Sequence, residues 1–229
     1  MLRLRNLSVS IGRLTVTLER LDIAGKTVLI GRNGSGKTTL LRAIAGFLGV
    51  GMGKILLDGE DITGLPPEKR PLGYVPQAVV PIPMQPAKQL EYFARLWGCD
   101  YRDIVEQLNL QGLLSKTRLS AGERQLLAIA TSLLKQPKIL LLDEPTSSLD
   151  WFNKQLVWDT LGRLDVPMLY VTHDPVEAIM VAEEVALLAN GVVQPSRRYP
   201  RPADLRETLE TLDLYRLFDR PPASHDVHH

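Results

Sequence analysis

The stretch 31–38 constrains the fold of this chain more than any other, because it matches the pattern G-x-x-x-x-G-K-[ST]. The apolar run 28–30 precedes it, and the residues 40–45 that follow are typical of a helix. A strand, a glycine-rich loop and a helix in this order form a cradle for a polyphosphate, since glycines allow close backbone approach and the helix presents its positive end there. We therefore expect an α/β fold of the phosphate-loop type.

The side chains at the end of this loop supply the expected chemistry. Lys37 provides a mobile cation for the β- and γ-phosphates of a nucleotide, and Thr38 provides a hydroxyl that can bind Mg²⁺. The nucleotide-binding residues that we expect in the loop are Gly31, Asn33, Gly34, Ser35, Gly36, Lys37, Thr38 and Thr39.

The composition narrows the class of protein. A hydrophobic content of 45% fits a globular chain with a core, and a formal net charge of +1 gives no overall field that would attract nucleic acid. The single cysteine, Cys99, excludes an intrachain disulfide and fits a reducing, cytoplasmic setting. No run approaches the roughly 20 apolar residues of a membrane-spanning helix. We expect a partner to hold the protein at a membrane if it works there.

Hydrophobic periodicity predicts the remaining architecture. Residues 2–23 alternate apolar and polar around Gly12-Arg13, which predicts an N-terminal antiparallel hairpin with one buried face. The helix after the phosphate loop is expected to run to about Leu48, with Gly49, Gly51 and Gly53 ending it. The fully apolar run 139–142 is typical of a strand in the middle of a parallel sheet. Together these elements predict a mixed sheet.

A helical insertion divides the predicted α/β core. Leu90, Phe93, Ala94 and Trp97 fall on one face of a helix within residues 78–118. The expected domains are a nucleotide-binding core at 1–77 and 119–194, a helical subdomain with a coupling groove at 78–118, and a helical tail at 195–229. Within the tail, a helix is expected over 203–214, and we interpret the histidines at 225, 228 and 229 as a polar end.

A second motif, which consists of two acidic residues, follows the apolar run 139–142. Asp143 stands directly after that strand, where a carboxylate in a phosphate-loop fold lies near Mg²⁺. Glu144 is one residue further on, where a carboxylate can orient or deprotonate a water molecule at the γ-phosphate. The pair therefore predicts a metal ligand and a general base.

Several short segments occur in one order, and together they resemble those of ABC-type ATPase subunits over about residues 2–194. The matching segments are Walker A at 31–38, the Q-loop at Gln77, the signature LSGGQ at 119–123, Walker B at 139–144, the D-loop at 148–150 and the H-loop at His173. A phosphate loop alone indicates only a large superfamily, whereas a signature followed by Walker B is highly specific. The fold that the resemblance implies is a phosphate-loop core with N-terminal antiparallel hairpins and an inserted helical subdomain.

The resemblance also implies a mechanism and its residues. ABC ATPases form head-to-tail homodimers in which each ATP lies between the Walker A loop of one subunit and the signature of the other. In this chain Ser120, Ala121, Gly122 and Glu123 would then complete the γ-phosphate site. Gln77 would contact Mg²⁺ or the attacking water, and His173 would contact the γ-phosphate. The implied catalytic residues are Glu144, His173 and Gln77, the implied metal ligands are Thr38, Gln77 and Asp143, and the implied cofactors are ATP and Mg²⁺.

The chain departs from the family pattern at three positions. Ala121 replaces a glycine and keeps the loop if its φ is negative. Glu123 replaces a glutamine and places a negative charge at a helix start, where the dipole favours it, although this charge could lower the affinity for the opposing ATP. The hairpin turn lacks the aromatic residue on which adenine usually stacks, so that Ile11 is expected to pack on the base.

The segment 61–77 resembles one importer group, which carries molybdate or tungstate, sulfate, sugars, polyamines and iron. The length of the chain resembles that of compact molybdate/tungstate-type ATPases. The implied partners are permease subunits and, through them, an extracytoplasmic solute-binding protein, with no nucleic acid. The implied location is the inner face of the cell membrane. An exporter ATPase subunit and a soluble ABC ATPase of cofactor assembly remain alternatives.

Overall fold

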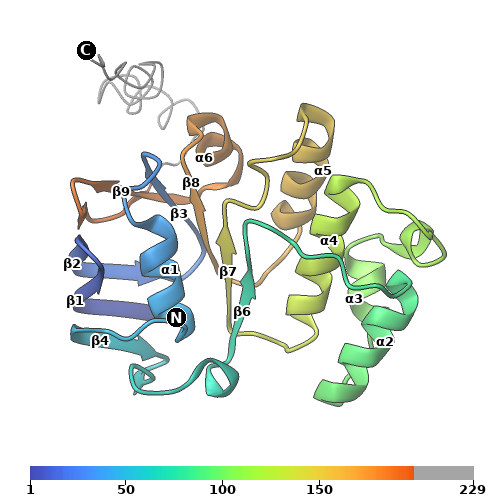
Figure 1. Ribbon diagram of the computed structural model, residues 1–229, viewed down its shortest axis with the longest axis horizontal. Coiled ribbons are helices and arrows are strands. Elements are labelled where there is room, and N and C mark those ends of the chain that lie inside the picture. Colours follow the sequence, from blue (N-terminus) through green and yellow to red (C-terminus); the bar gives the residue numbers. More distant parts are fainter. Residues whose placement is uncertain (199–229) are drawn as a thin grey trace, which may run out of the picture.

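The computed structural model describes residues 1–198, in which an 11-stranded sheet is flanked by helices (Figure 1). The predicted tail helix at 203–214 and the three tail histidines lie outside the described residues. The strands are β1 Leu2–Ile11, β2 Leu14–Ile23, β3 Lys26–Gly31, β4 Met52–Leu57, β5 Glu60–Asp61, β6 Leu72–Val75, β7 Ile139–Asp143, β8 Met168–Thr172, β9 Glu184–Ala189, β10 Val192–Val193 and β11 Arg197–Arg198. The α-helices are α1 Lys37–Ala45, α2 Pro86–Trp97, α3 Arg102–Gln107, α4 Ala121–Leu133, α5 Trp151–Gly162 and α6 Pro175–Val181, and two short 3₁₀ helices cover Pro67–Lys69 and Gln111–Leu113.

The strand order confirms the predicted mixed sheet and the N-terminal hairpin. The order is β5-β4-β1-β2-β10-β9-β3-β8-β7-β6, with β11 paired to β9. Strands β1, β2, β4 and β5 pair antiparallel, whereas β9, β3, β8, β7 and β6 pair parallel. Parallel strands have their carboxyl ends at one edge of the sheet. The phosphate loop follows β3, Gln77 follows β6, Asp143 ends β7 and His173 follows β8, so that all four lie along that edge.

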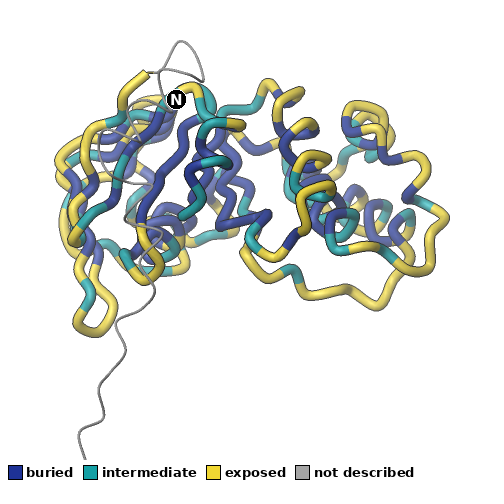
Figure 2. The backbone as a smooth tube through the Cα atoms, turned by 90° about the horizontal axis from the view of Figure 1, so that it is seen from above, coloured by how far each residue is buried: buried dark blue, intermediate teal, exposed yellow. Residues whose placement is uncertain are grey.

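Both faces of the central strands are buried (Figure 2). In β7, Leu140 and Leu142 pack in a cluster with apolar residues of α4, α5 and α6, whereas Ile139 and Leu141 pack in a second cluster with residues of α1. This explains why the strand is apolar throughout and does not alternate. Helix α1 is covered by the antiparallel strands on one side and by the central strands on the other (Figure 1).

Two details of the helix after the phosphate loop differ from the prediction. Helix α1 ends at Ala45 and not at Leu48, because Gly46 adopts a left-handed conformation with φ of 89° and donates its amide to the carbonyl of Ala43. Gly53 does not end this helix but lies within β4, beside an irregularity in the β1–β4 pairing. A Cβ at Gly53 would lie 2.5 Å from the carbonyl oxygen of Arg5, so only glycine fits this close approach of two strands.

Arg70 ties the end of helix α1 to the loop before β6. Its guanidinium is buried, with 2% of the residue exposed, and it donates hydrogen bonds to four backbone carbonyls. The acceptors are Ala43 O at 2.9 Å, Ile44 O at 2.6 Å, Thr63 O at 2.7 Å and Leu65 O at 2.8 Å. A cation at the carbonyl end of a helix is favoured by the dipole, and here it gives a donor to the Ile44 carbonyl and a second donor to the Ala43 carbonyl, which also accepts the amide of Gly46.

We predict that Arg70→Met lowers the free energy of unfolding by about 2–4 kcal/mol, because several buried carbonyls lose their donor. Urea unfolding followed by circular dichroism measures this change. Arg3→Met, at an exposed position of β1, is the matched control and should leave the unfolding midpoint nearly unchanged. Equal unfolding midpoints for Arg70→Met and the control would contradict the capping role.

Candidate nucleotide-binding and hydrolysis site

The phosphate loop between β3 and α1 adopts a conformation that requires its glycines. Gly34 and Gly36 have φ of 76° and 106°, values that favour glycine. A Cβ at Gly36 would lie 2.3 Å from Val16 Cγ2, and one at Gly31 would lie 2.6 Å from the carbonyl oxygen of Leu188. Within residues 1–198, the hydroxyl of Ser35 is buried and has no hydrogen-bond partner. A loop with close backbone approach, an unsatisfied donor and a helix N-terminus fits an oxyanion such as a phosphate group.

Lys37 is the first residue of α1 and is almost completely buried, with 4% of the residue exposed. Its ammonium group donates to Gly31 O at 2.8 Å and to Arg32 O at 3.1 Å. Nζ also lies 3.1 Å from Oε1 of Glu144, which gives a buried ion pair. The predicted cation is therefore held inside the loop by two carbonyls and one carboxylate.

Asp143 lies beside the start of the same helix. Thr38 Oγ1 donates to its Oδ1 at 2.9 Å, and Tyr74 OH donates to its Oδ2 at 3.0 Å. Burial raises the pKa of Asp143, and the hydrogen bonds from Thr38 and Tyr74 oppose this rise. Burial, together with the charge of Asp143, raises the pKa of Tyr74 to about 12, so the phenol stays protonated and donates.

The Thr38–Asp143 pair fits Mg²⁺, which prefers oxygen ligands and usually takes only one or two side chains besides substrate phosphates and waters. Within residues 1–198, no group of three or more His, Cys, Asp and Glu side chains could hold a metal ion by itself. The donor set therefore suits an ion that arrives with a nucleotide better than a closed protein cage.

Glu144 is the residue on which the predicted catalytic groups converge. Its Oε2 lies 3.1 Å from Nδ1 of His173 and accepts a hydrogen bond from Gln77 Nε2 at 3.4 Å, while its Oε1 pairs with Lys37. Its φ of 44° is unusual for a residue with a side chain, and such strain collects at functional sites. The structure thus brings Lys37, Gln77, Glu144 and His173 into direct contact.

The signature segment forms a separate half-site. Ser120 caps helix α4, which stands on the other side of β6 and β7 from α1 (Figure 1). Ser120 and Glu123 form a reciprocal capping box, in which Glu123 N donates to Ser120 Oγ at 3.2 Å and Ser120 N donates to Glu123 Oε2 at 2.8 Å. Glu123 also pairs with Lys116, and the hydrogen bond from Lys116 is the largest cause that lowers the pKa of Glu123.

The structure also shows the positions of Ala121 and Ile11, the other two departures from the family pattern, and of the neighbouring Gly122. Ala121 is the first residue of α4 and is absent from the residues with positive φ, so the condition for tolerating alanine is met. A Cβ at Gly122 would lie 2.3 Å from Asn153 Oδ1, so this glycine is sterically required. Ile11 ends β1 opposite Leu14 and is 50% exposed, so its side chain is accessible to a base.

Three contacts of the site were not predicted. Tyr74 reaches Asp143 from the neighbouring strand β6, and its position in an apolar run gave no sign of that contact. Lys116 precedes the signature by a few residues in a segment with no recognisable motif. Glu177, on α6, accepts hydrogen bonds from four side chains near His173, and no motif in the sequence indicates this network.

The comparisons with known proteins agree with this geometry. A model of the ABC transporter family matches residues 16–147. The chain is 40% identical over 181 residues to the molybdate/tungstate import ATP-binding protein WtpC of Archaeoglobus fulgidus, which covers 72% of this chain and 73% of the relative. It is 39% identical over 212 residues to the molybdenum import ATP-binding protein ModC of Thiobacillus denitrificans, which covers 85% of this chain but only 57% of the relative.

A solved structure has the same fold. It is the ADP conformation of MJ1267, described as an ATP-binding cassette of an ABC transporter, and it superposes with a TM-score of 0.81 over 95% of this chain and 98% of that one, at 20% sequence identity. The family match, the two relatives and the site geometry together lead to one conclusion: the chain belongs to the ABC transporter ATPase family.

Proposed function

We propose that this chain is the ATP-hydrolysing subunit of an ABC importer for a small oxyanion of the molybdate or tungstate kind. The observation that carries the proposal is the convergence of Lys37, Gln77 and His173 on Glu144, beside the Thr38–Asp143 pair. The names of the two relatives support the class of solute. The proposal includes permease subunits, a solute-binding protein and a location on the cytoplasmic face of the membrane.

The side chains would divide the reaction between them. Lys37 binds the β- and γ-phosphates, and Thr38 and Asp143 would hold Mg²⁺, which neutralises charge on the phosphate oxygens. Glu144 orients and deprotonates the attacking water, since Asp143 is engaged with the metal. Gln77 would also contact the metal or the water. His173 contacts Glu144 and holds it in place for attack.

One chain contains two complementary halves of this site, the phosphate loop with Asp143 and Glu144, and the signature with Ser120. The phosphate loop leads into α1 and the signature into α4, and these two helices lie on opposite sides of β6 and β7, so we expect the two halves to serve different nucleotides (Figure 1). A head-to-tail pair of identical chains would build two equivalent complete sites. ATP would then bridge the subunits, and hydrolysis would release them.

The first prediction of the proposed function concerns the general base. Glu144→Gln should lower the rate of ATP hydrolysis by about 10²–10⁴, the usual contribution of a general base. ATP binding should survive, because Lys37 and the loop backbone are unchanged. The bound nucleotide should then hold a dimer, which light scattering with Mg²⁺-ATP would detect and light scattering with ADP would not.

Lys37→Ala is the control for this experiment, since it should lose ATP binding itself, as measured by calorimetry. A Glu144→Gln protein that remains monomeric at saturating ATP would contradict the head-to-tail dimer. A protein that dimerises but retains the wild-type rate would show that Glu144 is not the base.

A second prediction concerns the acidic signature residue. In the proposed dimer Glu123 would place a negative charge near the phosphates of the opposing nucleotide, and its pairing with Lys116 offsets that charge. Lys116→Gln in the Glu144→Gln protein should therefore weaken ATP-driven dimerisation by about two- to fivefold, as expected of a partly exposed ion pair. The further substitution Glu123→Gln should restore dimerisation. In the Glu144→Gln background, dimerisation that is weaker with both Lys116→Gln and Glu123→Gln than with either substitution alone would contradict charge compensation.

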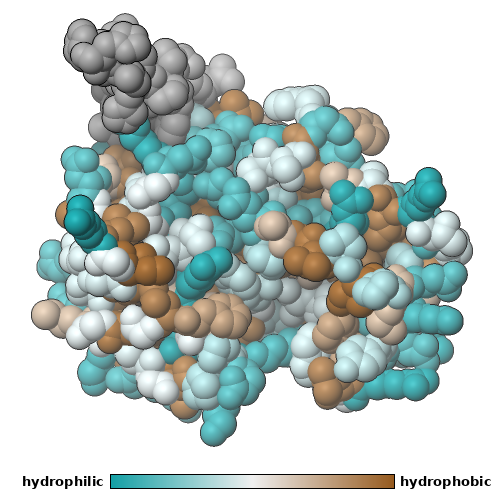
Figure 3. Space-filling view, viewed as in Figure 1, coloured by the Kyte–Doolittle hydropathy of each residue, from teal (hydrophilic) through white to brown (hydrophobic). Residues whose placement is uncertain are grey.

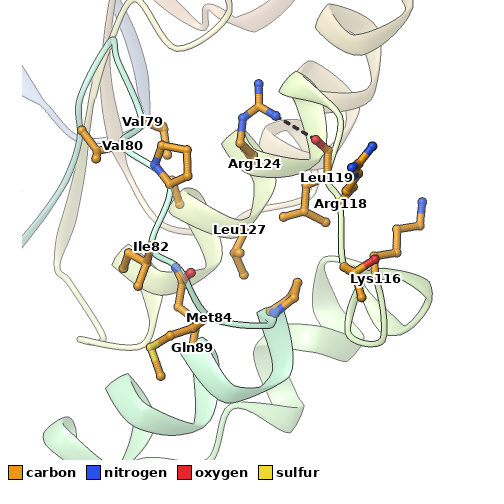
Figure 4. A pocket seen from close by; sticks show the side chains of 14 residues that line it. Val79, Val80, Ile82, Met84, Gln89, Lys116, Arg118, Leu119, Arg124 and Leu127 are labelled. Carbon is orange, nitrogen blue, oxygen red and sulfur yellow. Dashed lines mark hydrogen bonds between the residues drawn. The ribbon is translucent and has the colours of Figure 1, made fainter.

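The structure also contains an apolar groove suited to a permease. Figure 3 shows a hollow between the strand-rich and helix-rich parts of the molecule, with apolar surface on its rim. A cavity of about 280 Å³ there is lined by Phe47, Tyr74 and Trp97. A second cavity, of about 370 Å³, follows the Q-loop, where Val79, Val80, Ile82 and Met84 face Arg118, Leu119 and Leu127 (Figure 4).

The surface continues onto α2, where Met84, Tyr92 and Leu96 line a third cavity together with the charged residues Lys88, Glu91 and Arg95. Val80, Tyr92 and Leu96 are 81%, 56% and 63% exposed, so this accessible surface, which begins in the segment after Gln77, carries several apolar side chains. Apolar patches of this kind mark interaction sites. No helix within residues 1–198 is long and apolar enough to span a membrane. We infer that a cytoplasmic helix of a permease subunit docks in this groove and reaches Gln77.

The third prediction tests this docking. Leu96→Glu should shift the protein from the membrane fraction of its native cells to the supernatant, because a charge in the groove opposes burial of an apolar helix. The ATPase activity of the isolated subunit should stay within about twofold of wild type, since an exposed substitution away from the site has little effect on folding. Sedimentation and phosphate release measure the two quantities.

Met52→Glu is the matched control, because Met52 is 66% exposed on the antiparallel part of the sheet. It should leave membrane association unchanged. Membrane association of the Leu96→Glu protein at the control level would exclude docking at this groove. A wild-type protein found only with soluble partners would instead indicate an ABC ATPase of cofactor assembly.

A further inference from the structure

Glu177, on α6, is a buried carboxylate that the reaction described above does not use. Only 1% of the residue is exposed, and each of its two carboxylate oxygens accepts two hydrogen bonds. Oε1 accepts from Thr146 Oγ1 at 2.7 Å and from Lys154 Nζ at 2.8 Å. Oε2 accepts from Tyr170 OH at 3.0 Å and from Thr172 Oγ1 at 2.6 Å. Four donors satisfy the charge in the interior.

The donors keep the states that these bonds require. Burial, the largest single cause, lowers the pKa of Lys154, but the hydrogen bonds and charges of Glu177 and Asp174 together raise that pKa above its ordinary value, so the lysine stays charged. Burial, together with the charge of Glu177, raises the pKa of Tyr170 well above its ordinary value, so the phenol stays protonated. The network is therefore an ion pair between a buried carboxylate and a partly buried lysine, with neutral donors around it.

These contacts surround His173 on both sides along the chain. Thr172, directly before it, donates to Glu177, and the same hydroxyl oxygen accepts the amide of Asp174 at 3.0 Å. Asp174, directly after it, accepts a hydrogen bond from Lys154 Nζ on its Oδ2 at 3.1 Å. The backbone on each side of His173 is thus fixed to one buried pair, while its ring extends to Glu144.

We propose that Glu177, together with Lys154, is a positioning residue that sets His173 against Glu144 for hydrolysis. The proposal rests on the ATPase function proposed above. Glu177 contacts neither the phosphate loop nor Glu144 among its hydrogen-bond partners, and it acts through Thr172 and Asp174. An error of about 1 Å in the placement of a reacting group costs on the order of 10²-fold in rate, so a rigid support is needed.

Glu177→Gln tests the proposal, because the amide has one acceptor oxygen and leaves some of the four donors without a partner. In the full chain, kcat for ATP should fall by about 10- to 100-fold, whereas KM should change by less than about threefold because the phosphate loop is untouched. A loss that appears only in KM, or a folded variant with wild-type kcat, would overturn the proposal.

The effect should also disappear when His173 is removed. In a His173→Ala background, Glu177→Gln should lower kcat by less than about twofold, since residues that act as a unit are not additive. An equal fold-loss in both backgrounds would show a general structural role and overturn the proposal. If the wild-type protein itself hydrolyses no ATP, the proposed function is wrong, and the role of Glu177 in hydrolysis fails with it. If the wild-type protein hydrolyses ATP and the results above are not obtained, only the role of Glu177 fails.

Thr172→Val gives a second, milder variant in case Glu177→Gln does not fold. It removes one hydroxyl that joins Glu177 to the backbone beside His173, and it should lower kcat by about 10-fold with the same dependence on His173. Thr160→Val is the matched control, because Thr160 is also buried but its hydroxyl donates to Leu156 O within α5. Equal kcat for Thr172→Val and Thr160→Val would overturn the assignment.

Discussion

The carboxylate of Glu144 is the contact on which the site depends, since three side chains from three other segments reach it. Lys37 comes from the start of α1, Gln77 from the loop after β6 and His173 from the loop after β8. These segments are distant in sequence, and only the parallel order β3-β8-β7-β6 brings their carboxyl ends together. The register of β7 on β8, with Asp143 opposite Val171, sets the position of Glu144 relative to His173. The apolar strands therefore align the polar loops.

The buried ion pair between Lys37 and Glu144 can be replaced when another anion binds Lys37. Two ions removed from water are stabilised only by good partners, and Lys37 here has two carbonyls and one carboxylate. In the proposed reaction a bound polyphosphate supplies another anion for Lys37, which releases Glu144 to accept a proton from water. The left-handed backbone of Glu144 is held by its amide on Val171 O and by Ser147 N on its carbonyl. The backbone can thus stay fixed while the side chain changes partners.

The parts of the site that could be predicted from sequence are those that local chemistry determines. The glycines of the phosphate loop, the hairpin turn at Gly12-Arg13 and the acid after an apolar strand each depend on a few neighbouring residues. The contact of Tyr74 with Asp143 depends on the pairing of two strands, and the end of α1 depends on the choice of Gly46 over three later glycines. The contact and the end of the helix both depend on how distant segments pack, and a local sequence pattern does not contain that information. The tail interpretation falls beyond the described residues.

Asn153 on α5 explains why one residue of the signature stays glycine while the residue before it is alanine. Its side chain occupies the space where a Cβ of Gly122 would be, whereas Ala121 starts the helix without such a constraint. Ser120 Oγ lies 3.5 Å from Asn153 Oδ1, and Asn153 Nδ2 donates to Asp150 Oδ2 at 2.7 Å. The next residue, Lys154, enters the Glu177 pair beside His173. Helix α5 therefore supports both the signature and the segment of His173, so a displacement of that helix relative to the sheet would reach the two half-sites together.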